Sequence, residues 1–186
     1  MEKVEKEDIL REDLKSYFSS GKWKEFLKKV SNLLDLSLCN FVITHNEKIQ
    51  SFSNENPLCL KLREKEEGLK LCKEKYEKDL KAAQNKIKPH LSYCYASLLR
   101  ALIPININNK KFFIVMCGIK SKNKPKVNWK KIENIITKKD FLRYYKKISY
   151  NPIRKVKITV DAIQFLFALI FDLFIINEKL KSFLEK

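Results

Sequence analysis

The middle of the chain, residues 57 to 120, passes from a helical hydrophobic pattern to a strand-like one. Apolar positions first recur at intervals of three and four, which predicts a helix with one side against a core. Two runs of β-forming residues follow, Leu91 to Ile107 and Phe112 to Ile119, joined by the turn-like Asn108-Asn109-Lys110. The run from Leu91 to Ile107 fits either one long strand with a kink near Leu99 or two separate strands. The helical stripe consists of Leu69, Cys72, Tyr76, Leu80 and Ala83.

Helical and strand-like patterns also precede this segment. The sequence predicts a helix over residues 1 to 19, ended by Ser19-Ser20-Gly21, and a second helix from Trp23 to Leu34. A hairpin is expected next, with strands at Leu38 to Thr44 and Lys48 to Phe52. The first third of the chain is therefore predicted to hold two helices and a hairpin.

The helix in the middle segment has a clear start. Pro57 suits its first position and Asn56 suits its N-cap, because proline needs no hydrogen-bond partner there and asparagine accepts one from the first turn. Gly68 is predicted to interrupt this helix, which then continues from Leu69 to about Gln84.

Helices are expected at the end of the chain, at Trp129 to Ile136, Lys139 to Ile148 and about Thr159 to Glu185. The stretch from Val160 to Asn177 is almost uniformly apolar. Its polar residues favour a buried or dimer-forming helix over a membrane span, because a carboxylate at mid-bilayer costs about 2.5 to 3.5 kcal/mol. These residues are Asp161, Gln164 and Asp172.

The strands come in hairpin-adjacent sets and do not alternate with crossover helices, which predicts an antiparallel sheet. The fold class is α+β, with a PAS-like antiparallel sheet, flanking helices and a long apolar C-terminal helix. At 186 residues the chain suits one domain, which we expect at residues 22 to 186 behind an N-terminal helix at residues 1 to 21.

Composition and charge narrow the functional classes. Three glycines leave neither a GxGxxG nor a GxxxxGK[ST] loop for phosphate binding. The net charge of +17 allows a basic nucleic-acid-binding module, whose affinity would fall steeply with salt. Only five arginines are present, however, and base-edge readout relies on arginine forks. Nucleic-acid binding is therefore kept as a second alternative, and an anionic partner or membrane surface is equally compatible with the charge.

Five cysteines and an N-terminus without an apolar signal segment point to a reducing, cytoplasmic location. Cys59 and Cys72 lie in the helical part and Cys94 on the first predicted strand, a layout that can bring three thiols together. Three thiolates could hold zinc or an iron–sulfur cluster, with His90 or Cys117 as a further ligand. The spacing lacks the CxxC pairs of a zinc finger, so packing in the core and redox sensing remain open.

No Ser-His-Asp order, HExxH motif or carboxylate pair indicates an enzyme. The strand from Phe112 to Ile119 is apolar on both faces, so one face meets helices and the other meets a helix, a partner or an enclosed cavity. Tyr93 and Tyr95 share a face of the preceding strand. Strand alternation makes Tyr93 and Met116 candidates for lining such a cavity.

A set of residues in fixed order covers the central segment: Cys59, Leu62-Arg63, Gly68, Cys72, Cys94, Pro104-Ile105 and Gly118. This pattern resembles the PocR sensory domain of bacterial signalling proteins, over roughly Lys22 to Leu184. The chain departs from the family pattern in one segment. The family commonly has Cys-His-Ala-Gly where this chain has Cys94-Tyr95-Ala96-Ser97.

The resemblance implies a PAS-like sensor of small hydrocarbon derivatives, 1,2-propanediol being the family's name-giving example. It makes Cys59, Cys72, Cys94 and Tyr95 ligand-binding candidates by motif position. No DNA-binding, kinase or cyclase segment is expected in the remaining residues. The chain is therefore expected to be a free-standing sensor that acts through a protein partner or a homodimer formed by the terminal helices, or a piece of a longer sensor. The alternative is a metal- or redox-responsive regulator that uses Cys59, Cys72 and Cys94.

Overall fold

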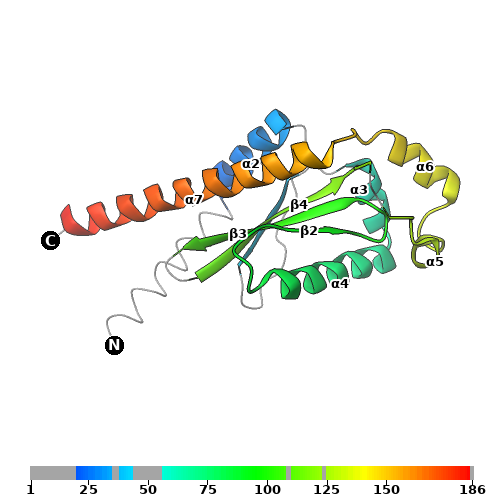
Figure 1. The fold of residues 1–186 in the computed structure, drawn as a ribbon, viewed down its shortest axis with the longest axis horizontal. Coiled ribbons are helices and arrows are strands. Elements are labelled where there is room, and N and C mark those ends of the chain that lie inside the picture. Colours follow the sequence, from blue (N-terminus) through cyan, green and yellow to red (C-terminus); the bar gives the residue numbers. More distant parts are fainter. Residues whose placement is uncertain (1–19, 35–37, 44–55, 108–109, 123–124, 185–186) are drawn as a thin grey trace.

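The computed structural model of the chain describes residues 20–34, 38–43, 56–107, 110–122 and 125–184. The helix predicted over residues 1 to 19 and the strand predicted at Lys48 to Phe52 lie outside the described residues. Figure 1 shows the arrangement of the elements.

The described elements confirm the predicted α+β class, the PAS-like antiparallel sheet with flanking helices and the long C-terminal helix. In chain order they are α2 (Gly21–Leu34), β1 (Leu38–Ile43), α3 (Pro57–Arg63), α4 (Glu66–Ala83), β2 (His90–Tyr93), β3 (Leu99–Ile107), β4 (Lys110–Ile119), α5 (Trp129–Ile132), α6 (Lys138–Lys146) and α7 (Ile153–Leu184).

Within the described residues the sheet has four strands in the order β1-β4-β3-β2, and every neighbouring pair is antiparallel. The first predicted β run is two strands, β2 and β3. A turn separates them, in which the Cys94 amide donates to Leu98 O (2.9 Å) and the Ser97 amide to Cys94 O (3.0 Å). The expectation that Cys94 lies on a strand is therefore wrong, since its backbone closes this turn.

The prediction for the start of α3 is confirmed, because the Asn56 side chain accepts a hydrogen bond from the Cys59 amide (2.8 Å) and Pro57 is the first helical residue. The predicted interruption at Gly68 is wrong. The helical path breaks at Glu64 and Lys65, and Gly68 lies inside α4. Gly68 instead allows close approach, since a Cβ there would lie 1.7 Å from the Leu62 carbonyl oxygen.

Helix α7 begins at Ile153, six residues before the predicted Thr159. Its first turns carry Arg154, Lys155 and Lys157, whose charges hide the helical apolar pattern in the sequence. The two shorter helices are close to their predicted positions, although α5 ends at Ile132 and not at Ile136.

The two faces of the sheet are covered by different helices (Figure 1). On one face, α7 packs along β3 and β4, and α2 adds partly buried side chains to the same core. The Gln164 side chain of α7 also donates to the carbonyl oxygens of Pro104 (2.8 Å) and Ile87 (2.9 Å). The buried residues of this face include Ala101, Ile103, Ile114, Met116, Val160, Ile163 and Phe167.

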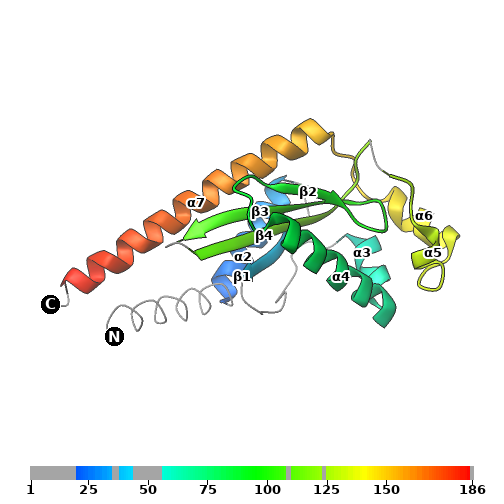
Figure 2. The same ribbon diagram turned by 60° about the horizontal axis from the view of Figure 1, so that its bottom comes forward.

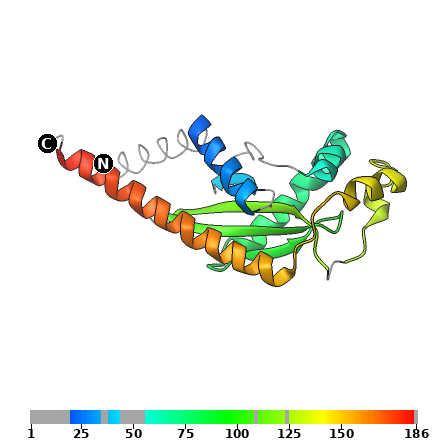
Figure 3. The ribbon, with the colours of Figure 1, turned by 90° about the horizontal axis from the view of Figure 1, so that it is seen from above.

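The other face is covered by α4, with Tyr76 and Ala83 of the helix packed on Leu102, Phe113 and Val115 of the sheet. At one end of the sheet, α3, α5 and α6 gather beside the β2–β3 turn (Figure 2). Their shared end cluster includes Leu58, Leu62, Leu98, Ile132, Phe141 and Tyr145. Helix α7 leaves the sheet in the opposite direction (Figure 3).

Replacement of Phe141 by alanine should destabilise the fold by about 3 to 5 kcal/mol, the usual cost of removing a buried phenylalanine. Phe141 is 2% exposed and lies between the rings of Trp129 (5.0 Å) and Tyr145 (5.5 Å). The adjacent Leu142 is 45% exposed, so Leu142→Ala should change stability by less than about 0.5 kcal/mol. Equilibrium urea unfolding measures both values, and equal effects would contradict the described end cluster.

Candidate functional site

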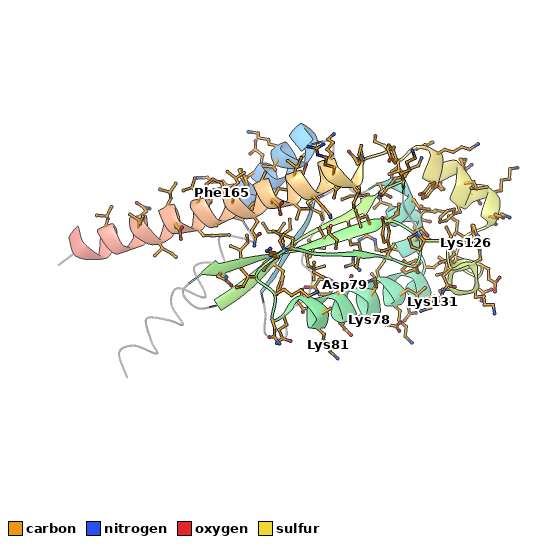
Figure 4. The ribbon with its side chains drawn as sticks, in the orientation of Figure 1. Lys78, Asp79, Lys81, Lys126, Lys131 and Phe165 are labelled. Atoms are coloured by element: carbon orange, nitrogen blue, oxygen red, sulfur yellow. The ribbon has the colours of Figure 1, made fainter. Side chains whose placement is uncertain are left out.

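A cleft of about 300 Å³ lies where α4, the β2–β3 turn and the segment leading into α5 meet. Its volume is at the lower end of the range for small-molecule sites. Figure 4 shows the elements and labels three of its lysines. The cleft is lined by Leu71, Glu74, Lys75 and Lys78 of α4, by Tyr93, Cys94 and Tyr95, and by Lys126, Asn128 and Lys131.

The β2–β3 turn forms one wall of the cleft and is held by two hydrogen bonds to the segment before α5. The Asn128 amide donates to the Tyr95 carbonyl oxygen (3.1 Å), which ties the turn to the segment before α5. The Ser97 hydroxyl donates to Pro125 O (2.6 Å) in the same segment. Ser97 has φ 58°, a conformation that costs energy for a residue other than glycine, and this hydrogen bond helps to hold it.

Tyr95 joins the turn to α4. Its hydroxyl donates to the Gly68 carbonyl oxygen (3.2 Å) and lies 3.0 Å from the Cys72 sulfur. Burial raises the pKa of Tyr95 well above its ordinary value, and the neighbouring Cys72 raises it further. Tyr95 is therefore a neutral hydrogen-bonding group at neutral pH, and it fixes the distance between two walls of the cleft.

Four thiols lie near one another at the cleft, one each from α3, α4, the β2–β3 turn and β4. The Cys59 thiol forms a hydrogen bond with Cys117. This hydrogen bond is the largest cause of the raised pKa of Cys59, and burial is the second. Cys94 and Cys72 are close enough to raise the pKa of Cys59 as well. The prediction that the sequence brings Cys59, Cys72 and Cys94 into one region agrees with these couplings.

The chemistry of this thiol group is that of protonated sulfur. Burial raises the pKa of Cys72 and the pKa of Cys94. The backbone amides of Leu98 and Ala96 donate to the Cys94 sulfur and so offset part of the rise in the pKa of Cys94. A redox sensor or metal ligand needs the thiolate, which a raised pKa disfavours. In the described part of the chain, no group of three or more His, Cys, Asp or Glu side chains is arranged to hold a metal ion. The predicted zinc or iron–sulfur site therefore receives no support from this geometry.

A buried charged network adjoins the cleft and was missed by the sequence analysis. Asp79 of α4 is 2% exposed and contacts Lys75, and it accepts a hydrogen bond from Ser92 (2.8 Å). Arg100 of β3 lies 3.4 Å from the same carboxylate, and His90 lies 3.8 Å from it. Burial lowers the pKa of His90, which favours its neutral form. The signal in the sequence was Arg100, a single charge inside an apolar strand run.

The predicted site residues lie in three places. Cys94, Tyr95 and Tyr93 line the cleft. Cys59 and Cys72 lie behind it, with Cys59 in the end cluster and Cys72 against the Tyr95 hydroxyl. Met116 is fully buried on the opposite face of the sheet, in the core with α7. The cleft thus combines aromatic and polar groups and can hold a small organic molecule.

The family model described as the sensory domain found in PocR matches residues 17–174, most of the chain. The chain belongs to this family. The protein is therefore a sensory domain. Membership of this family supports a role in small-molecule sensing and suggests a role other than catalysis. Comparisons with curated proteins and with solved structures each found no match.

Two glycines that carry the PocR pattern have a geometric role in this site. Gly118 has φ +74° and lies at an irregularity of the β3–β4 pairing, as in a β-bulge. Leu99 pairs with Ile119 and Ala101 with Met116, so β4 has one more residue than β3 between these pairs. The Asn56 side chain donates to the Gly118 carbonyl oxygen (2.9 Å), and a Cβ at Gly118 would lie 1.9 Å from that side chain. Gly68 lets α3 and α4 meet. The glycine common in the family at position 97 would suit the positive φ that Ser97 adopts here.

Replacement of Gly68 by alanine should lower the free energy of unfolding by about 3 kcal/mol, because the new Cβ would collide with the Leu62 carbonyl and move the α3–α4 junction. Gly21→Ala is the matched control. Nothing lies within 4 Å of a Cβ at Gly21, so its stability should stay within about 0.5 kcal/mol. Thermal and urea unfolding would compare them, and a tolerated Gly68→Ala would argue against the close helix approach.

Proposed function

We propose that this PocR sensory domain is a cytoplasmic sensor that binds a small hydrocarbon derivative, of diol-like size, in the cleft beside the β2–β3 turn. The observation that carries the proposal is the position of Cys94 and Tyr95. Cys94 belongs to the residues that resemble the family pattern, Tyr95 follows it directly, and both line the cleft. Tyr93 is the third contact we assign to the ligand.

The small size of this ligand class limits its binding affinity. A propanediol-sized molecule has about five heavy atoms, and the best small ligands gain about 1.5 kcal/mol per atom, which limits the binding free energy to about −7.5 kcal/mol. The corresponding dissociation constant is micromolar at best. Such an affinity suits a sensor that reports the level of an abundant metabolite.

The thiols support the site from behind in this proposal. Cys72 holds Tyr95 through the 3.0 Å contact, and Cys59 packs in the end cluster. Met116 belongs to the core under α7, so we assign it no contact with the ligand.

Filling the cleft should strongly weaken ligand binding and leave the fold intact. Asn128 is exposed at the cleft, and its contact with the turn uses only backbone atoms, so Asn128→Trp places an indole in the opening. Binding of 1,2-propanediol and related short diols, measured by calorimetry, should fall by at least about tenfold because the ring occupies the ligand's volume.

The matched control is Asn134→Trp. Asn134 is exposed, lies just after α5 and does not line the cleft, so this variant should bind as the unchanged protein does. If Asn128→Trp binds its ligand normally, the cleft is not the sensory site.

We further propose that the signal leaves through the outer side of α7, paired with the same helix of a second copy. Opposite its buried side, α7 carries a stripe with intervals of four, three and four residues, repeated twice. An eleven-residue apolar repeat is the spacing of helices that pair in a right-handed supercoil. The Phe165 side chain is 73% exposed and lies on the side of α7 away from the sheet (Figure 4). The outer stripe is Ile158, Ala162, Phe165, Leu169, Leu173, Ile176 and Leu180.

A membrane is the other candidate for covering this stripe. By length and composition the stretch Ile153–Asn177 could cross a bilayer, a criterion that the core helices of soluble proteins also meet. We favour the second copy because Val160, Ile163 and Phe167 of the same stretch are buried against the sheet, which a spanning helix could not keep.

Leu169→Glu should convert the proposed dimer into a monomer, since it places a carboxylate at the centre of an apolar helix pair. Analytical ultracentrifugation over a dilution series should show the dissociation constant rise by at least about tenfold. The control is Lys157→Glu, which introduces the same residue at an exposed position of α7 outside the stripe and should leave association unchanged. A monomeric unchanged protein that sediments with lipid vesicles would instead favour membrane attachment.

A further inference from the structure

The cleft carries an excess of positive charge. Four lysines line it, Lys75, Lys78, Lys126 and Lys131, against one acidic residue, Glu74. Lys75 differs from the other three because it is paired with the buried Asp79 and also donates to Ser92 (3.0 Å). Three ammonium groups and one carboxylate therefore remain at the opening.

These three lysines come from two separate parts of the chain. Lys78 extends from α4, whereas Lys126 lies in the segment before α5 and Lys131 in α5 itself (Figure 4). None of them forms an ion pair with another described residue. Lysines elsewhere do form such pairs, as between Lys29 and Glu25 (3.0 Å). A group of like charges around one opening is unfavourable unless an anion joins them.

The walls of the cleft strengthen this effect. Leu71, Tyr93 and Tyr95 supply apolar and aromatic surface beside the ammonium groups. Charges next to low-dielectric walls in a concave site act on a bound anion more strongly than charges on an open surface do. Asn128 adds a neutral amide that can donate to an oxygen atom of the ligand.

We propose that the ligand of this cleft carries an acidic group, a carboxylate or a phosphate, held between Lys78 of α4 and Lys126 and Lys131 of the opposite segment. The aromatic wall would contact the short hydrocarbon part. This inference rests on the proposed function, because it assumes that the cleft is the sensory site. It specifies a small organic acid or phosphate ester within the broader class of hydrocarbon derivatives.

A small anion fits better than a nucleic acid. The three lysines line one concave space of about 300 Å³, which is large enough for a single acidic group and a few carbon atoms. Nucleic-acid binding uses a stripe or groove of positive charge that follows many phosphates, with arginines prominent. The cleft has no arginine among its lining residues.

The experiment compares lactate, inorganic phosphate and 1,2-propanediol by calorimetry, with the fluorescence of Trp129, which lies between Asn128 and Lys131 in the sequence, as a second signal. Lactate differs from the diol by a carboxylate in place of a hydroxymethyl group. We expect lactate or phosphate to bind at least about tenfold more tightly than the diol, because each ion pair contributes a factor of up to about five. Tighter binding of phosphate than of lactate would identify a phosphate ester, and the reverse a carboxylic acid.

The test variant is the triple change Lys78→Gln, Lys126→Gln and Lys131→Gln, which should weaken anion binding by about tenfold because it removes the proposed ion pairs. The charge-matched control changes three exposed lysines outside the cleft, Lys81→Gln, Lys130→Gln and Lys138→Gln. This control should bind the anion normally. Glu74→Gln removes the acidic residue of the lining and should tighten anion binding.

Several results would overturn the inference. If the diol binds as tightly as lactate, and Asn128→Trp but not the triple variant abolishes both, the cleft is the sensory site but does not select an acid. If anion binding alone persists in Asn128→Trp, the anion does not bind in the cleft and the inference fails; if diol binding persists as well, the cleft is not the sensory site and the proposed function fails too. If the triple variant and its control weaken anion or oligonucleotide binding equally, the charge acts over the whole surface.

Discussion

A sheet that is apolar on both faces must be covered on both, and this requirement organises the PocR domain described here. Helix α7 covers one face and α4 covers the other, so each helix is held by burial of its own apolar stripe. The end of the sheet near the β2–β3 turn is reached by α4 but not filled by it. The cleft lies at this end, between a rigid helix and a turn that hydrogen bonds tie down.

The same arrangement gives the cleft a physical route to α7. Tyr95 connects the turn to α4, and β3 continues from the turn along the buried side of α7. A ligand that shifts the turn would therefore act on β3 and, through the Gln164 contacts, on the helix that we propose as the output. Such a signal requires that the ligand bind two arrangements of the domain with different affinity.

The sequence was sufficient to predict elements whose pattern depends on local spacing, such as α4 and the capped start of α3. It was less informative where tertiary contacts decide. The sequence predicts a helix break at Gly68 because the close approach of Gly68 to Leu62 is not visible in it. The sheet face on which Met116 lies depends on the strand register, which the sequence alone does not give. The lysines of the cleft cannot be singled out among the many others in the sequence, since only the folded chain brings Lys126 and Lys131 to the same cleft as Lys78.

The hydrogen bond from Gln164 to the carbonyl oxygen of Pro104 has a consequence for solubility. β2 pairs with β3 only as far as Leu102, so the remainder of β3 has no described neighbour on that side. Proline offers no amide hydrogen there, and its carbonyl is occupied by Gln164. A foreign strand therefore finds neither donor nor acceptor at this position, which protects the open edge from aggregation by strand addition.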